Sequence, residues 1–186
     1  MHFVKAFISF FVVLTIGLSC PAFAALLNNP LAHPLLAFDN TGVTTYNAAT
    51  DRFSVDASPI AIRLSPTTAP VLITPSGGSE RVTIGIQVNG TGALVGGIAG
   101  DDLVVVGEVN LGALGVFSGI LLTGEIVQFG FQNGLVGVVD FYDFRFTVTG
   151  GLLAFLYAGR DLGVAISSEQ STFAGNFNVN FTGEAK

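Results

Sequence analysis

Apolar residues alternate with polar residues or glycine in many short runs along this chain. The clearest run is RVTIGIQV, residues 81–88, in which every second residue from Val82 to Val88 is aliphatic. Successive side chains of a β-strand point to opposite faces of a sheet, so these aliphatic side chains share one face. Asn89-Gly90 follows directly, and this pair favours a tight hairpin turn. The run therefore predicts a half-buried strand that leads into a hairpin.

Glycine and β-branched residues are abundant within and between these runs. The chain has 24 glycines among 186 residues, 50% of its residues are hydrophobic and 11% are charged. Both residue types disfavour helices, by up to about 1 kcal/mol each relative to alanine. We therefore expect an all-β fold of about ten strands, either an antiparallel β-sandwich or a small closed barrel. Helical spacing occurs only near residues 152–158, where we expect at most one short helix.

Two strand predictions depend on small details of the pattern. In residues 115–132, GVFSGILLTGEIVQFGFQ, the alternation slips by one at Gly124, which predicts a bulge there. Residues 172–181, TFAGNFNVNF, predict a closing strand in which Phe177, Val179 and Phe181 point inward.

The first 24 residues, 1–24, have the pattern of a secretory signal peptide. Lys5 supplies a positive charge, an apolar run spans residues 6–18, and residues 22–24 (Ala-Phe-Ala) suit a signal peptidase. We expect cleavage after Ala24 and a secreted protein, extracellular or periplasmic. A lipoprotein signal ending at Cys20 is the alternative, but the aliphatic residue expected three positions upstream is missing.

The mature chain divides into an arm and one domain. Residues 25–36 contain two prolines, which block regular structure, so we expect an N-terminal arm or linker there. Residues 37–186 follow as a single β domain with room for a sizeable core. Cys20 is the only cysteine and leaves with the predicted signal peptide, so neither a disulfide nor a cysteine-bound metal is expected.

The charge of the mature chain restricts its partners. From Ala25 onward 6 basic residues face 13 acidic residues, which gives a net charge of 6 − 13 = −7. Such a chain has no electrostatic attraction to nucleic acid or to an anionic membrane surface. We expect no nucleic-acid partner and no stable membrane insertion after signal cleavage.

Charged residues interrupt an aromatic strand at residues 138–151, VVDFYDFRFTVTGG. The rings within Tyr142–Phe146 share one parity, while Asp143 and Arg145 share the other. We expect the rings in the core and an exposed ion pair between Asp143 and Arg145, contributing about 0 to 1 kcal/mol. A binding or catalytic role is the alternative. Asp140 shares the parity of the rings, and we expect it at the strand entry.

The remaining titratable residues give no catalytic constellation. His33 lies in the proline-flanked arm, so neither a Ser-His-Asp triad nor a zinc site is expected. Glu108 and Glu125 lie in apolar strands and are interpreted as solvent-face or edge residues, with a carboxylate enzyme as the alternative. Asp101 and Asp102 follow a glycine and predict a turn, with a calcium site as the alternative. We assign no catalytic, metal-binding or cofactor-binding residue and expect no cofactor.

Four segments together resemble exported, glycine-rich β proteins of environmental bacteria, including PEP-CTERM-type hypothetical proteins. They are residues 37–62, 121–131, 142–151 and 171–186. The resemblance covers most of the chain from Ala37 onward and is structural, so it implies no functional residue. The sorting tail of the tailed members, with its Pro-Glu-Pro motif, apolar helix and basic end, is missing from this sequence.

These observations favour a non-enzymatic structural, matrix or adhesion-type protein of the cell surface. Surface polysaccharide or other matrix proteins are the expected partners. A β module that binds a glycan or a small apolar ligand is the alternative. An outer-membrane barrel is a further alternative, but its apolar side chains would face outward, and here the phenylalanines have the inward parity.

Overall fold

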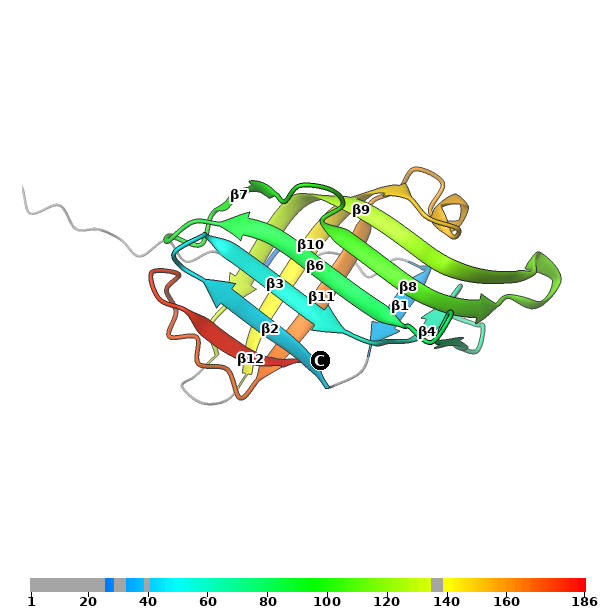
Figure 1. Ribbon diagram of the computed structural model, residues 1–186, viewed down its shortest axis with the longest axis horizontal. Coiled ribbons are helices and arrows are strands. Elements are labelled where there is room, and N and C mark those ends of the chain that lie inside the picture. Colours follow the sequence, from blue (N-terminus) through cyan, green and yellow to red (C-terminus); the bar gives the residue numbers. More distant parts are fainter. Residues whose placement is uncertain (1–25, 29–32, 39–40, 135–138) are drawn as a thin grey trace, which may run out of the picture.

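The computed structural model describes residues 26–28, 33–38, 41–134 and 139–186 (Figure 1). It confirms the all-β prediction, with 12 strands where about ten are expected. The predicted signal peptide, residues 1–24, and Cys20 lie outside the described residues. The helices of the described ranges are two 3-10 turns of 3 residues each. None of them approaches the length of a membrane-crossing apolar helix.

Eight strands close an antiparallel barrel, which selects the barrel over the sandwich (Figure 1). The wall runs β8-β9-β10-β11-β12-β2-β3-β6, and β6 pairs with β8 to close it. In chain order these strands are β2 (Gly42–Asn47), β3 (Arg52–Ala57), β6 (Arg81–Val88), β8 (Leu103–Asn110), β9 (Val116–Gln132), β10 (Val139–Gly150), β11 (Leu162–Glu169) and β12 (Phe181–Ala185).

The other four strands extend the wall at its edges. β1 (Leu35–Phe38) pairs with β4 (Pro59–Arg63), β4 pairs with β5 (Val71–Thr74), and β5 pairs with the far half of β8. β7 (Leu94–Gly97) pairs with β6. β1 begins two residues before Ala37, where the strand pattern of the sequence begins.

The β8–β9 hairpin continues beyond the barrel and forms one end of the molecule's long axis (Figure 1). Its turn contains η1 (Gly112–Leu114). The turn after β10 contains η2 (Ala154–Leu156), within the predicted range 152–158. This turn is held against the hairpin by the backbone of Leu152, whose N–H donates to the carbonyl of Ile120 at 3.0 Å.

A cluster of aromatic rings packs inside the barrel beside aliphatic side chains. Neighbouring ring centroids lie between 4.6 and 6.3 Å apart in one connected cluster. Its members are Tyr46, Phe53, Phe129, Phe131, Tyr142, Phe144, Phe146, Phe173, Phe177 and Phe181. The rings of Tyr142, Phe144 and Phe146 in β10 are fully buried, which confirms their predicted inward parity, while the fourth ring of this strand, Phe141, has the outward parity and is 41% exposed.

The segment between β11 and β12 closes one end of the barrel with side chains rather than with a strand. Phe173 and Phe177 are buried among the core rings, yet the strand begins only at Phe181. The predicted strand over residues 172–180 is therefore wrong, and Val179 is half exposed. Side-chain to backbone hydrogen bonds replace the missing ladder, such as that from the Phe173 N–H to Ser171 Oγ at 3.1 Å.

The long strand β9 bends at several register shifts. One lies where Gly124 pairs with Val148 and Thr123 pairs with Gly150, which leaves Thr149 of β10 as the extra residue. This confirms the predicted irregularity at Gly124, although the additional residue belongs to the partner strand.

Candidate functional site

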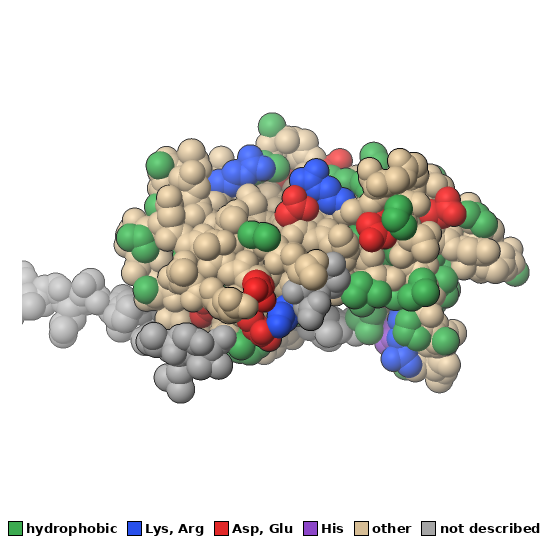
Figure 2. Space-filling view, turned by 60° about the horizontal axis from the view of Figure 1, so that its bottom comes forward, with side chains coloured by type: hydrophobic (Ala, Val, Ile, Leu, Met, Phe, Trp, Pro, Cys, Tyr) green, Lys and Arg blue, Asp and Glu red, His purple; other side chains and the backbone are tan. Residues whose placement is uncertain are grey.

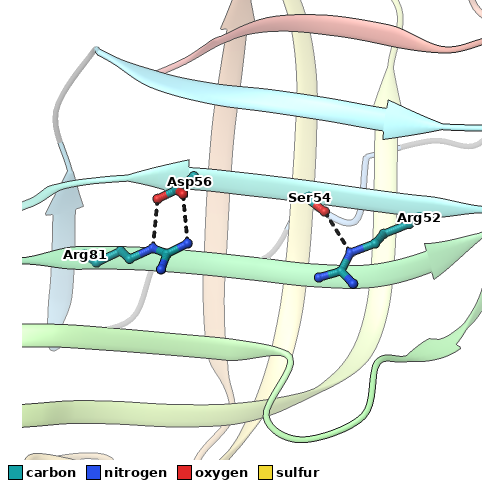
Figure 3. Close-up of polar contacts among 4 residues, drawn as sticks. All are labelled: Arg52, Ser54, Asp56 and Arg81. Atoms are coloured by element: carbon teal, nitrogen blue, oxygen red, sulfur yellow. Dashed lines mark hydrogen bonds and ion pairs between the residues drawn. The ribbon is translucent and has the colours of Figure 1, made fainter.

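A polar hollow of about 630 Å³ lies on the outer face of β2, β3 and β6. On this face Arg81 donates from Nε and Nη2 to the two carboxylate oxygens of Asp56, at 3.1 and 2.9 Å (Figure 3). Arg52 Nε donates to Ser54 Oγ at 3.2 Å (Figure 3). The Arg81–Asp56 pair is largely exposed, so it contributes at most about 1 kcal/mol. The described lining offers no aromatic ring on which a sugar could stack.

Asp102 is a structural residue at the start of β8. It is 1% exposed, and its carboxylate accepts the backbone N–H groups of Ile98 at 2.6 Å and Ile126 at 2.8 Å. Its own backbone N–H donates to Gly124, and its carbonyl accepts from Gly85. These contacts join β6, the segment before β8, and β9. The prediction of a turn that contains Asp102 is confirmed, and the carboxylate satisfies backbone donors.

Asp101 and Glu125 lie beside this carboxylate. Asp101 Oδ1 accepts a hydrogen bond from Thr149 Oγ1 at 2.9 Å. Glu125 is exposed, and partial desolvation together with the charges of the two aspartates raises its pKa. Across the described residues, no three His, Cys, Asp or Glu side chains are grouped so that they could hold a metal ion.

Glu108 and Glu125 lie far apart on the same sheet. Leu103 pairs with Gly124, so Glu125 is level with Asp102, while Glu108 is six residues further along β8. At about 3.3 Å per residue, the two glutamates are separated by roughly 20 Å. A pair of glycosidase carboxyl groups is only about 5 to 9.5 Å apart. The structure does not bring these two residues into one site.

His33 is packed at the beginning of β1. Its Nε2 atom is buried and, among the described residues, has no hydrogen-bond partner. The next residue, Pro34, accepts a hydrogen bond from the hydroxyl of Tyr157 at 3.4 Å. His33 thus lies against the folded domain and not in a free linker.

The predicted ion pair between Asp143 and Arg145 is wrong. Arg145 pairs with Asp161 at the start of β11, with 3.2 Å between Nε and Oδ2. Asp143 is only 6% exposed, and its Oδ2 atom accepts the backbone N–H of Asn28 at 3.0 Å. The parity of the strand is as predicted, but the N-terminal arm covers its outer face at Asp143.

Asp140 lies inside β10, one residue after its start, and is buried. Its Oδ1 atom accepts the backbone N–H of Gly134 at 3.0 Å, so it holds the segment that leaves β9. This confirms its expected place at the strand entry.

A hollow of about 390 Å³ adjoins Asp143 on the outer face of β10 and β11; we refer to it as the Asp143 hollow. It is lined by Leu26, Asn28, Phe141, Tyr142, Asp143, residues 164–167 and Lys186. Asp143 Oδ1 is buried, and no hydrogen-bond partner reaches it within the described parts of the chain.

Apolar side chains are exposed around the tip of the β8–β9 hairpin and the neighbouring η2 turn. We call this surface the apolar end, and its exposed members are Leu114, Val116, Ile120, Leu152 and Phe155, each 45–60% exposed. The rings of Phe155 and Phe117 are 5.8 Å apart and join the two segments, on the face of β9 opposite that of Val116 and Ile120. Figure 2 shows only scattered hydrophobic side chains toward the tip of the hairpin, while the densest group in that view lies beside the histidine near β1 and is separate from the apolar end.

A second apolar feature is a groove of about 280 Å³ between β1 and the barrel wall. It is lined mainly by Leu35, Leu36, Phe38, Val82, Leu103 and Leu162. This groove offers a small apolar ligand a place beside β1, against side chains that also belong to the hydrophobic core.

No family model, no curated protein and no solved structure matches the chain.

The Arg145–Asp161 ion pair could have been predicted from the sequence, whereas the contact between Asn28 and Asp143 could not. Asp161 follows the turn after β10, so an antiparallel hairpin places it diagonally opposite Arg145. Asn28 lies 115 residues before Asp143, and no pattern in the sequence connects the two.

Proposed function

We propose that this chain is an exported, non-enzymatic matrix or adhesion-type protein of the cell surface, which associates with further copies of itself through its apolar end. The signal-peptide pattern of residues 1–24 supports export. The observation that carries the proposal is the group of exposed apolar side chains at this end, since exposed apolar surface gathered in one region of a soluble protein usually marks an interaction site.

The apolar end is suited to contact between identical copies. Residues 109–124 and 146–159 contain no charged residue, and they meet at this end. Two copies can therefore approach here without repulsion, although the whole chain has a net charge of −6. In the described structure, residues 116–119 of β9 pair with β8 along one edge. The opposite edge is open to strand pairing with another copy.

The candidate catalytic residues support the non-enzymatic part of the proposal. The carboxylate of Asp102 accepts hydrogen bonds from two backbone N–H groups, and Arg145 forms an ion pair with Asp161. Glu108 is separated from Glu125 by roughly 20 Å, given the rise of about 3.3 Å per residue along a strand. Each of these side chains has a structural or solvent-exposed environment.

Sedimentation velocity of residues 25–186 over a wide range of concentration tests the association. We expect association that the double variant Val116→Ser, Phe155→Ser weakens at least tenfold, because both side chains are exposed at the apolar end. Val43→Ser is the matched control, since Val43 is similarly exposed but lies on β2 of the barrel. A wild type that stays monomeric, or equal weakening by the control, contradicts the proposal. Export is tested by the mass of the full chain's product outside the cytoplasm, which should begin at Ala25.

The apolar groove favours a second candidate function, the binding of a small apolar ligand. Titration with Nile red should then give saturable fluorescence that Leu36→Asn reduces and Val43→Asn does not. Fluorescence that rises without saturation would exclude a defined site. The glycan alternative has weaker support, because the described lining of the polar hollow lacks rings.

A further inference from the structure

Asp143 is a buried carboxylate in which one of the two oxygens has a hydrogen-bond partner among the described residues and the other has none. Oδ2 accepts the N–H of Asn28 at 3.0 Å, whereas Oδ1 is buried and, as far as the chain is described, unpartnered. Burying an unpaired charge costs several kcal/mol in a protein. A ligand that supplies a positive charge and an N–H donor to Oδ1 would remove this cost.

The cationic side chains nearest to Asp143 are engaged elsewhere. Lys186 lines the same hollow, but its Nζ atom is bonded to Glu169 Oε2. Arg145, two residues along β10, pairs with Asp161. The described chain therefore gives Asp143 no cationic partner.

The walls of the Asp143 hollow indicate the chemistry of the missing group. Leu26, Phe141 and Val164 contribute apolar surface, and about 390 Å³ is within the usual range for small-ligand sites. A guanidinium group binds best through both carboxylate oxygens, but Asn28 already occupies Oδ2. An ammonium group needs only one oxygen. We infer that the Asp143 hollow binds a primary ammonium group carried on a short apolar chain.

Such an ammonium group has two possible sources. One is a small external amine. The other is the chain itself, because cleavage after Ala24 would create an α-ammonium group at Ala25, one residue before Leu26 in the wall of the hollow. The internal source depends on the predicted cleavage. Neither source depends on association through the apolar end, so the two proposals can fail separately.

Titration with n-butylamine in amine-free buffer tests the site. Residues 25–186 include every described residue, and their backbone amides can be followed by NMR. We prepare this chain with a free and with an acetylated N-terminus, and n-butanol serves as the uncharged control. We expect saturable shifts with n-butylamine at residues around Asp143, at least in the acetylated chain, and none with n-butanol. Asp143→Asn should weaken binding at least tenfold, while Asp56→Asn, on the outer face of β3 and outside the lining of the hollow, should leave it unchanged.

The two chain forms distinguish the sources. If the chain's own terminus fills the hollow, the free form does not bind n-butylamine, and the α-amine titrates above its usual value of about 8 by roughly one unit or more. If the ligand is external, both forms bind equally and the α-amine titrates normally. The inference is overturned if neither form binds n-butylamine and the α-amine titrates normally, or if Asp143→Asn changes neither result. Should Asp143→Asn not fold, the wild-type titrations still decide.

Discussion

Replacement of Phe53 by alanine should be among the most damaging single changes in this barrel. Phe53 is fully buried, and its ring lies 4.9 to 6.1 Å from those of Phe129, Tyr142, Phe144 and Phe181. Burying a phenylalanine side chain contributes about 1.5 to 3 kcal/mol, and the cavity left by alanine raises the cost to about 3 to 5 kcal/mol. Because four ring contacts are lost together, we expect about 4 to 5 kcal/mol. A domain typically has only about 5 to 15 kcal/mol in total.

Urea unfolding followed by circular dichroism measures this loss, with Phe155→Ala as the matched control. Phe155 undergoes the same chemical change, but it is 55% exposed and contacts one ring, that of Phe117. We expect the control to cost about 1 kcal/mol or less. If Phe53→Ala does not fold, Phe53→Leu should still destabilise more than Phe155→Leu. Equal costs at the two positions would show that Phe53 is not packed within the ring cluster as described.

Three further predictions concern polar groups. Asp102→Asn should lower the free energy of unfolding in urea by about 2 to 3 kcal/mol. The two carboxylate oxygens each accept one backbone N–H, and an amide has only one oxygen to offer. A loss below about 0.5 kcal/mol would contradict this role. Burial chiefly raises the pKa of Tyr46 and Tyr157 to about 12, and it also raises that of Tyr142. The stability that the three neutral phenols contribute is therefore complete below about pH 10, the pKa of an unfolded tyrosine, and is lost as pH rises through the pKa values of the folded protein. Ultraviolet titration should therefore show phenolate only as the protein unfolds, and early titration would refute the burial. Because the pKa of Glu125 is raised, its neutral form is favoured in the folded protein, and the stability from this preference is lost as pH rises and the carboxyl ionises. Glu125→Gln removes the charge, so it should raise Tm at neutral pH and have little effect at about pH 4.

Local periodicity was sufficient to predict which strand faces are buried. The aliphatic face of residues 81–88 and the rings of Tyr142, Phe144 and Phe146 lie in the core as their alternation requires. Side-chain direction in a strand depends only on position along it, so this part of the fold is determined locally. Periodicity failed at residues 172–180, where Phe177 is buried from a loop and the same alternation arises without a strand.

The environment of the candidate site could not be predicted in this way. The parity of Asp143 correctly placed it on the outer face of β10, but parity says nothing about what covers that face. The cover comes from Asn28, and its contact depends on tertiary packing. Barrel closure has the same origin, since the sequence left sandwich and barrel open until the pairing of β6 with β8 was known.

The pairing of β2 with β12 also determines the order in which the molecule can be assembled. Gly42 lies opposite Ala185, so this seam joins barrel strands from opposite ends of the domain sequence. The β2–β3 and β8–β9–β10 hairpins can form from neighbouring segments, whereas this seam must wait until β12 is available. Closing so long a loop is a slow step, and β-rich folds of this kind fold in about milliseconds to seconds. Until then the open wall exposes its aromatic lining and two unpaired edges, which makes this interval the one in which the chain is most prone to aggregate.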